Sequence, residues 1–167
     1  MSILKSVTDK TGNSVDILQY KITYVQGAES TTLDAIYGAG VSTVNACNEM
    51  KMVKEAFDQT GRKGFHHLIF NPENGKDVSN DDFINMGIQM SEYIRHFHGT
   101  YQVLMAMHSN GKEDNPRHLH FIVNNIDVLN GSRMNLNKKC LYELKQGLSQ
   151  IAADYGIEPI RQYHFNA

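Results

Sequence analysis

The stretch YQVLMAMHSNGKEDNPRHLHFIVNNID, residues 101–127, contains two apolar runs separated by a polar loop. The runs cover residues 101–108 and 117–127. The loop SNGKEDNPR holds a glycine and a proline, which are typical of a turn between strands. We therefore expect a β-hairpin with a loop of about nine residues.

Side chains alternate between the two faces of a strand, so every second residue of the second run points the same way. One face carries His118, His120, Ile122 and Asn124. The other face is wholly apolar and should point to a core. Because His118 and His120 stand about 7 Å apart at their Cα atoms, their imidazoles can converge on one cation.

A third histidine, His108, closes the first run and should lie beside the other two in the hairpin. Three imidazoles leave coordination positions open, through which a metal polarises a substrate. Any one of them alone is more often a hydrogen-bonded surface residue, so the joint arrangement favours a metal site. His66 and His67 are adjacent and face opposite sides of a strand; one could approach the site, and His66 is our candidate.

The remaining segments predict an α+β fold. Helices are predicted at 14–25, 43–60, 80–98 and 137–155, and further strands at 31–40 and 64–71. An Asn-Gly turn at 130–131 indicates a small hairpin. The order is strand, helix, strand, helix, strand, helix, strand, strand, small hairpin, helix. It predicts a largely antiparallel β-sheet with helices packed on it.

Composition limits the function classes. The 167 residues suit one domain, 1–167, and 41% of them are hydrophobic. A net charge of −2 argues against a sequence-blind nucleic-acid coat but not against a local basic groove. Without a signal peptide or a membrane-length apolar run, we expect a cytoplasmic protein with no membrane insertion. Cys47 and Cys140 are expected to be reduced thiols.

The segment MAMHSNGKEDNPRHLHFIVNN resembles the relaxase (mobilisation nuclease) family of conjugative plasmids and integrative elements, in the His-hydrophobic-His endonuclease superfamily. The matching positions are His108, His118, His120 and Asn124. Weaker similarity covers ITYVQGAEST, AIYGAG, GFHHLIFN and NLNKKCLYELKQGLSQIAADYGI, in the family's order. The resemblance implies the relaxase fold. Family members commonly continue into further domains, so the chain could be the N-terminal part of a longer protein.

The resemblance implies a strand-specific nickase of single-stranded DNA at a transfer origin. In the family a tyrosine attacks the phosphodiester, leaving a 5′-phosphotyrosyl link and a free 3′-OH, and the strand is later rejoined. The expected metal is manganese or magnesium, although three histidines would also accept zinc. The bacterial partners implied are other relaxosome proteins and secretion-channel coupling proteins.

Local similarity places the nucleophile at Tyr24. Tyr20 lies one helical turn earlier and is the second choice, and Tyr37 is a weaker third. All three could instead be core or interface residues. The family often has an acidic residue two positions after the first histidine, where this chain has Asn110, and Glu113 or Asp114 could replace it.

DNA contacts are expected from basic residues on the C-terminal side: Arg117, Arg133, Lys138 and Lys139. Asn124 could steady a histidine or contact DNA, or simply be a strand-end asparagine. Three alternatives stay open: a rolling-circle replication initiator of the same superfamily, a DNA-binding accessory protein that does not cut, and a small cupin-like metal-binding β domain. The cupin-like reading conflicts with the long helices between strands.

Overall fold

A five-stranded antiparallel sheet forms the centre of the computed structural model, which describes residues 1–9, 12–27, 31, 35–61, 63–111 and 116–162. The strands are β1 (Ile3–Val7), β2 (Ile36–Ala39), β3 (Phe65–Asn71), β4 (Val103–His108) and β5 (His118–Asn124). Their order across the sheet is β1-β3-β5-β4-β2. The predicted hairpin is the β4–β5 pair, and the α+β class is confirmed.

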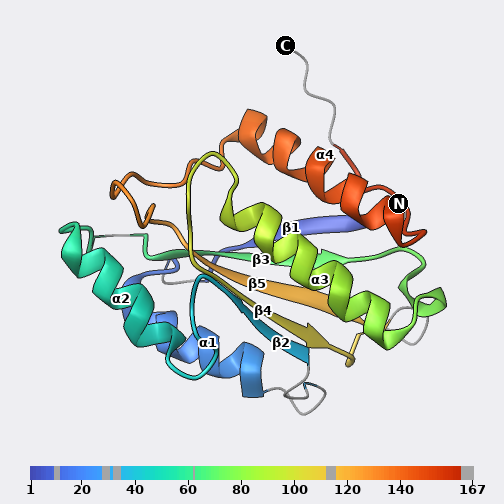
Figure 1. Ribbon diagram of the computed structural model, residues 1–167, viewed down its shortest axis with the longest axis horizontal. Coiled ribbons are helices and arrows are strands. Elements are labelled where there is room, and N and C mark those ends of the chain that lie inside the picture. Colours follow the sequence, from blue (N-terminus) through green and yellow to red (C-terminus); the bar gives the residue numbers. More distant parts are fainter. Residues whose placement is uncertain (10–11, 28–30, 32–34, 62, 112–115, 163–167) are drawn as a thin grey trace.

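Helices cover both faces of the sheet (Figure 1). They are α1 (Leu18–Gly27), α2 (Ala46–Ala56), α3 (Asn80–Arg95) and α4 (Lys138–Asp154). The larger core joins α3 and α4 to one sheet face, and a smaller core joins α1 and α2 to the other. Across the described ranges, the helices are too short or too polar to span a bilayer.

Helix α3 shows how local sequence and packing agree. The Ser79 hydroxyl caps its first turn by accepting the backbone N–H of Asp82 at 3.1 Å. Gly87 faces the sheet, where an added Cβ would lie 3.0 Å from Met105 Cε and 3.2 Å from the Leu119 methyl groups. The glycine therefore lets the helix approach β4 and β5 closely.

Some predicted boundaries shift. The helix expected at 43–60 begins at Ala46 and ends at Ala56, and the helix expected at 80–98 ends at Arg95. The small hairpin around the Asn-Gly turn is reduced to one antiparallel bridge between Ile126 and Arg133. In the strand expected at 31–40, residues 32–34 lie outside the described residues.

One lysine of α2 is buried rather than solvated. Lys54 is fully buried, and its Nζ donates to Asn125 Oδ1 at 2.8 Å. Burial, with a smaller contribution from the charge of Arg133, lowers the pKa of Lys54 to about 7. The amine therefore joins α2 to the segment after β5, and its burial favours the neutral form.

The buried Lys54 predicts a stability that rises with pH. Between about pH 7 and 10.5 the unfolded chain binds more protons at this amine than the folded chain, so the free energy of unfolding increases with pH. We expect the wild type to gain about 2 kcal/mol between pH 7 and 9 relative to Lys54→Met. Urea unfolding at several pH values measures this difference.

The half-buried Lys51, on the same helix, provides the control. Lys51→Met should keep the pH slope of the wild type. Equal slopes in the wild type and Lys54→Met would contradict a depressed pKa at Lys54.

Candidate active site

Three histidines meet where β4 ends and β5 begins. His108 is the last residue of β4 and lies directly opposite His118, the first residue of β5. His120 lies two residues farther along β5, opposite Ala106, which belongs to the smaller core. The three histidines therefore share the sheet face that α1 covers in part.

The three rings are close enough to serve one metal ion. Their centroids are 4.1 Å apart for His108 and His120, 4.9 Å for His118 and His120, and 5.3 Å for His108 and His118. One ring nitrogen from each lies within 4.8 Å of the others. Nitrogens on a common ion lie roughly 3 Å apart, since each bond is about 2.1 Å long. Small side-chain rotations would bring the three nitrogens to that separation.

Hydrogen bonds indicate which nitrogen each histidine offers. His108 Nε2 lies 2.8 Å from the Val25 carbonyl oxygen, so this nitrogen donates its hydrogen and Nδ1 keeps its lone pair. His118 Nδ1 lies 3.4 Å from the Pro116 carbonyl oxygen, which leaves Nε2 for a metal. His120 Nε2 is buried without a hydrogen-bond partner among the described residues. The donor set therefore fits a divalent cation.

Burial favours the neutral form of His118 and His120. It lowers the pKa of His120 to about 2, with further lowering from the neighbouring histidines. Burial also lowers the pKa of His118. Neutral rings keep the lone pairs that a metal needs.

Tyr24 lies beside the histidines. Its ring centroid is 6.1 Å from that of His108 and 6.2 Å from that of His120, and half of its surface is exposed. Helix α1 places it there because Leu18, Ile22 and Val25 are buried in the smaller core. A half-exposed tyrosine beside a three-histidine site is suited to attack a bound substrate.

The two other candidate tyrosines are placed differently. Tyr20 is 65% exposed, one turn earlier on α1, and its ring contacts Lys21. Tyr37 lies on β2 and packs against the larger core, on the opposite face of the sheet. Its hydroxyl donates to Glu92 Oε1 at 2.8 Å, and this hydrogen bond raises the pKa of Tyr37. Tyr37 therefore lies on the other side of the sheet from the three histidines.

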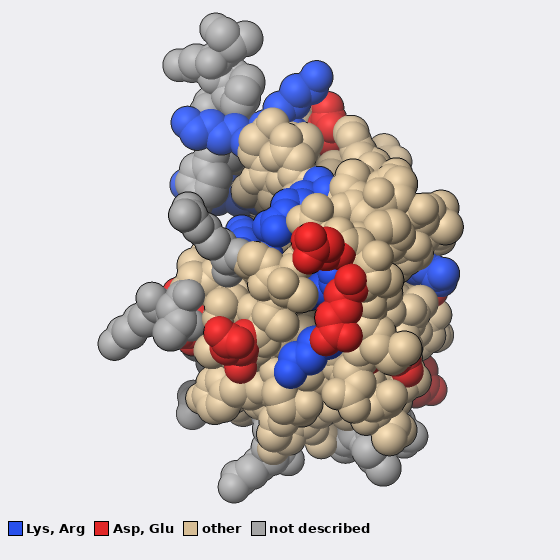
Figure 2. Space-filling view, turned by 90° about the vertical axis from the view of Figure 1, so that its left-hand side faces the viewer, with Lys and Arg blue, Asp and Glu red and all other residues tan. Residues whose placement is uncertain are grey.

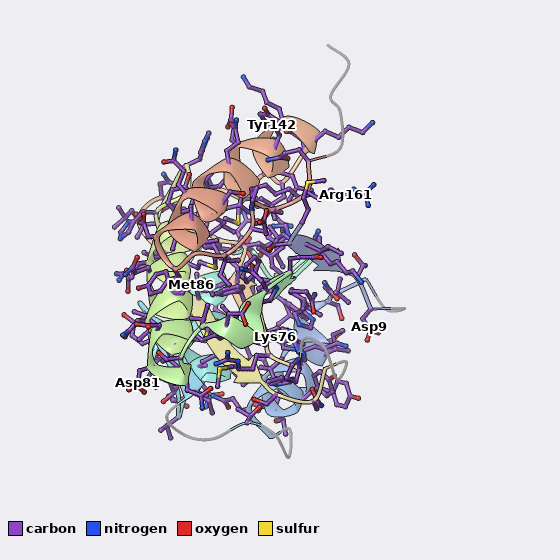
Figure 3. All side chains as sticks on the ribbon, turned by 90° about the vertical axis from the view of Figure 1, so that its right-hand side faces the viewer. Asp9, Lys76, Asp81, Met86, Tyr142 and Arg161 are labelled. Atoms are coloured by element: carbon purple, nitrogen blue, oxygen red, sulfur yellow. The ribbon has the colours of Figure 1, made fainter. Side chains whose placement is uncertain are left out.

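Lys21 places a positive charge next to Tyr24. Its Nζ lies 5.9 Å from the centroid of the Tyr24 ring and forms an ion pair with Asp9 Oδ2 at 2.9 Å. Figure 3, which faces this end of the sheet, shows α3 and α4 on one side of the strands and α1 on the other, with Asp9 on the α1 side. The lysine was not among the residues that the sequence suggested.

The structure corrects the choice of histidine on β3. His66 lies opposite Val123 of the larger core, so it faces away from the three histidines. His67 lies opposite Ile122 of the smaller core, on their face. Its Nε2 is 2.9 Å from His120 Nδ1. Sequence did not discriminate between the two because the alternate residues on both faces of β3 are mainly apolar.

Asn124 is a structural residue in this chain. It is fully buried, and its Nδ2 donates to Gln102 Oε1 at 2.9 Å and to the Met50 carbonyl oxygen at 3.2 Å. It lies at the far end of β5 from His118. These contacts join β5 to α2, and none of the hydrogen bonds of Asn124 among the described residues involves a histidine.

Arg117 is also structural. It is 9% exposed, and its guanidinium donates to Asn80 Oδ1 at 2.8 Å and to the carbonyl oxygens of Gly75 and Val78. The guanidinium carbon lies 4.8 Å from the centroid of the Phe83 ring. These contacts hold Arg117 against α3 and the loop before it, so most of its side chain is covered by the protein.

The other basic candidates lie away from the histidines. Arg133 is bridged to Ile126, beyond the far end of β5, and donates to Gln59. Lys138 and Lys139 begin α4, on the opposite face of the sheet. Figure 2 shows the end of the molecule remote from the histidines, where acidic and basic side chains are mixed. The predicted basic surface is therefore not adjacent to the site.

Asn110, which stands where the family often has an acidic residue, is exposed just beyond the end of β4. Glu113 and Asp114 lie outside the described residues. Cys47 and Cys140 are free thiols.

Comparison with known proteins places this site in a family. A family model described as "Relaxase: MobA/VirD2-like, nuclease domain" matches residues 24–157. Protein rlx of Staphylococcus aureus is 25% identical over 113 residues, which cover 67% of this chain and 32% of that protein. The chain thus aligns with about a third of the length of this relative.

Solved structures share the fold. A MobM relaxase domain bound to 26-nucleotide pMV158 oriT DNA matches with a TM-score of 0.63 and 10% identity, covering 99% of this chain and 92% of that one. A structure described under vancomycin resistance transfer in Staphylococcus aureus matches with a TM-score of 0.64 and 11% identity, covering 99% and 98%. The relaxase TrwC, metal-bound and with oriT DNA, gives 0.52 and 11%, covering 93% and 68%.

The family match covers most of the chain, including the candidate tyrosine and all three histidines, and the fold agrees with it. This chain belongs to the MobA/VirD2-like relaxase family, and the part of the family that it matches is the nuclease domain.

Proposed function

We propose that residues 1–167 act as one nicking domain that cleaves and rejoins single-stranded DNA at a transfer origin. The observation that carries this proposal is the position of Tyr24, whose ring lies within 6.2 Å of those of two of the three clustered histidines. Membership of the relaxase family supports the reaction class. Structural relatives described as bound to oriT DNA support the substrate.

The chemical step begins when the Tyr24 hydroxyl oxygen attacks the scissile phosphorus. A bond forms between phosphorus and the phenol oxygen, the bond to the 3′ oxygen breaks, and the phenol proton passes directly or through solvent to the departing 3′ oxygen. The products are a 5′-phosphotyrosyl link and a free 3′-OH. Because the phosphodiester is conserved in the link, the 3′-OH can later reverse the step.

His108, His118 and His120 would hold the divalent metal, through Nδ1 of His108 and Nε2 of the other two. A bound manganese or magnesium ion supplies Lewis-acid polarisation of the scissile phosphate, and zinc is the alternative for three imidazole ligands. Imidazole ligands carry no negative charge, so the three histidines would not offset the positive charge of an ion bound there.

A basic side chain of β1 lies on the same sheet face as the three histidines. Lys5 of β1 is exposed and lies in the same cross-strand row as His120, with Ile69 of β3 between them. We propose that Lys5 and Lys21 contact phosphates on either side of the scissile bond. We place the protein in the bacterial cytoplasm, where other relaxosome proteins and secretion-channel coupling proteins would be its partners.

The proposal predicts a covalent adduct in which the protein is joined to the 5′ end of the DNA fragment downstream of the nick. Single-stranded oligonucleotides that tile the DNA around the protein's own coding sequence would be incubated with the protein and Mn²⁺, then denatured. With the reactive sequence, a 3′-terminal label should migrate with the protein and a 5′-terminal label should not. Chelation of the metal should prevent the adduct, so that neither label migrates with the protein.

Peptide mass spectrometry of the adduct would locate the modified residue. An oligonucleotide that binds tightly but never forms an adduct in any tested metal would contradict nicking, and would favour a DNA-binding accessory protein. Transfer of the 5′ label instead would contradict the proposed direction of attack.

A further inference from the structure

His67 contacts His120, a candidate metal ligand, but is not itself one of the three clustered histidines. It lies on β3, which pairs with β5, and faces the same side of the sheet as His120. The distance from His67 Nε2 to His120 Nδ1 is 2.9 Å, and the two ring centroids are 5.2 Å apart. His67 is 3% exposed, as is His120. The contact is therefore a buried, direct hydrogen bond between two imidazoles.

The direction of this hydrogen bond follows from the role of His120. If Nε2 of His120 is to bind a cation, it must carry a lone pair, and the single hydrogen of the neutral ring must sit on Nδ1. That hydrogen then points at His67 Nε2, which must accept it. His67 in turn carries its own hydrogen on Nδ1, which is buried without a partner among the described residues.

We propose that His67 is a positioning residue: it accepts the Nδ1 hydrogen of His120, and so fixes the tautomer and ring orientation that present His120 Nε2 to the divalent ion. The proposal rests on the metal site of the proposed function. Three observations support it: the hydrogen bond between His67 and His120, the burial of both rings, and the absence of a hydrogen-bond partner for His120 Nε2 among the described residues. Partners of this kind raise metal affinity by holding the ligand in place.

A histidine in this place has a consequence that a carboxylate would not have. A carboxylate behind a ligand adds a negative charge near the ion, whereas a neutral imidazole adds none. With His67 as the acceptor, the described side chains around the ligand atoms orient His120 without offsetting the charge of the ion. The site then keeps its attraction for an anionic phosphodiester.

Two substitutions at the same position separate hydrogen bonding from packing. In His67→Gln the terminal amide reaches the place of Nε2 and can accept from His120, whereas in His67→Asn the amide ends near the place of Nδ1 and cannot. Both are neutral and polar. His66→Asn makes the same change in the adjacent buried histidine, which faces the opposite side of the sheet.

The measurement is the Kd of Mn²⁺ by isothermal titration calorimetry without DNA, with Co²⁺ absorption spectra as a second readout of the ligand set. His67→Asn should weaken Mn²⁺ binding by about 10- to 100-fold. His67→Gln and His66→Asn should stay within about threefold of the wild type. Far-UV circular dichroism would verify that each variant is folded.

Wild-type affinity in His67→Asn would overturn the proposal. So would an equal loss in His67→Gln, or in His66→Asn, because general loosening of β3 would then be the cause. If the wild type binds the metal and the variants behave as expected but no DNA adduct forms, nicking fails while the role of His67 stands. If the wild type binds no metal, the role of His67 fails.

Discussion

Tyr24→Phe is expected to abolish the covalent adduct and to reduce cleavage of the origin strand by roughly 10³-fold or more, as loss of a catalytic nucleophile does in other enzymes. Phenylalanine keeps the ring that packs at 6.1 Å from His108, so it removes the hydroxyl and little else. The measurement is adduct formation with a 3′-labelled oligonucleotide. Fluorescence anisotropy with the same oligonucleotide should show DNA binding within a few-fold of the wild type.

Tyr20→Phe is the matched control. It makes the same change one turn away on α1, at a tyrosine that is more exposed and contacts Lys21. It should form the adduct at close to the wild-type rate. The reverse pattern, with the adduct lost in Tyr20→Phe and kept in Tyr24→Phe, would assign the nucleophile to Tyr20. An adduct in both variants and in the double variant would exclude both tyrosines.

The second large effect is expected from removing a metal ligand. His118→Ala should weaken Mn²⁺ binding by more than about 100-fold. Mutation of a residue that only hydrogen-bonds to a metal ligand already costs about 10- to 100-fold in affinity, and loss of a ligand itself should cost more. Adduct formation should fall by roughly 10³-fold, because a metal contributes several kcal/mol of charge stabilisation in the transition state. His118 is the half-buried member of the three, so its truncation disturbs the core least.

Thermal unfolding provides an independent readout of the same change. Saturating Mn²⁺ should raise the Tm of the wild type, because the ion binds the folded state, and should leave the Tm of His118→Ala unchanged. His98→Ala is the control: His98 is exposed and pairs with Glu143 on α4, on the other side of the sheet. A metal-dependent Tm in His118→Ala would contradict its role as a ligand.

The sequence predicts most of the geometry of the three histidines. Alternation along a strand places His118 and His120 on one face, and the hairpin brings His108 opposite His118. Both inferences depend on neighbours in sequence, which local patterns describe well. The capped helix α3 is predictable for the same reason, because Ser79 and the periodic apolar residues are local signals.

What the sequence could not give depends on contacts between distant segments. The pairing of β3 with β5 decides that His67, not His66, reaches His120. Arg117 looks like a solvated base beside a strand, yet α3 and the loop before it bury its guanidinium. Lys54 similarly looks like a surface residue of α2 until Asn125, 71 residues away, accepts from it. Charged residues that are buried by tertiary packing carry no local signature.

The hydrogen bond from His108 to the Val25 carbonyl bears on how the proposed nicking reaction would be organised. Val25 directly follows Tyr24, so one imidazole contacts the backbone that carries the tyrosine while its other nitrogen faces the ligand cluster. The tyrosine backbone and the ligand are thus preorganised by the protein before DNA arrives. Substrate binding energy need not order this part of the site, and more of it remains for aligning the phosphodiester with the hydroxyl.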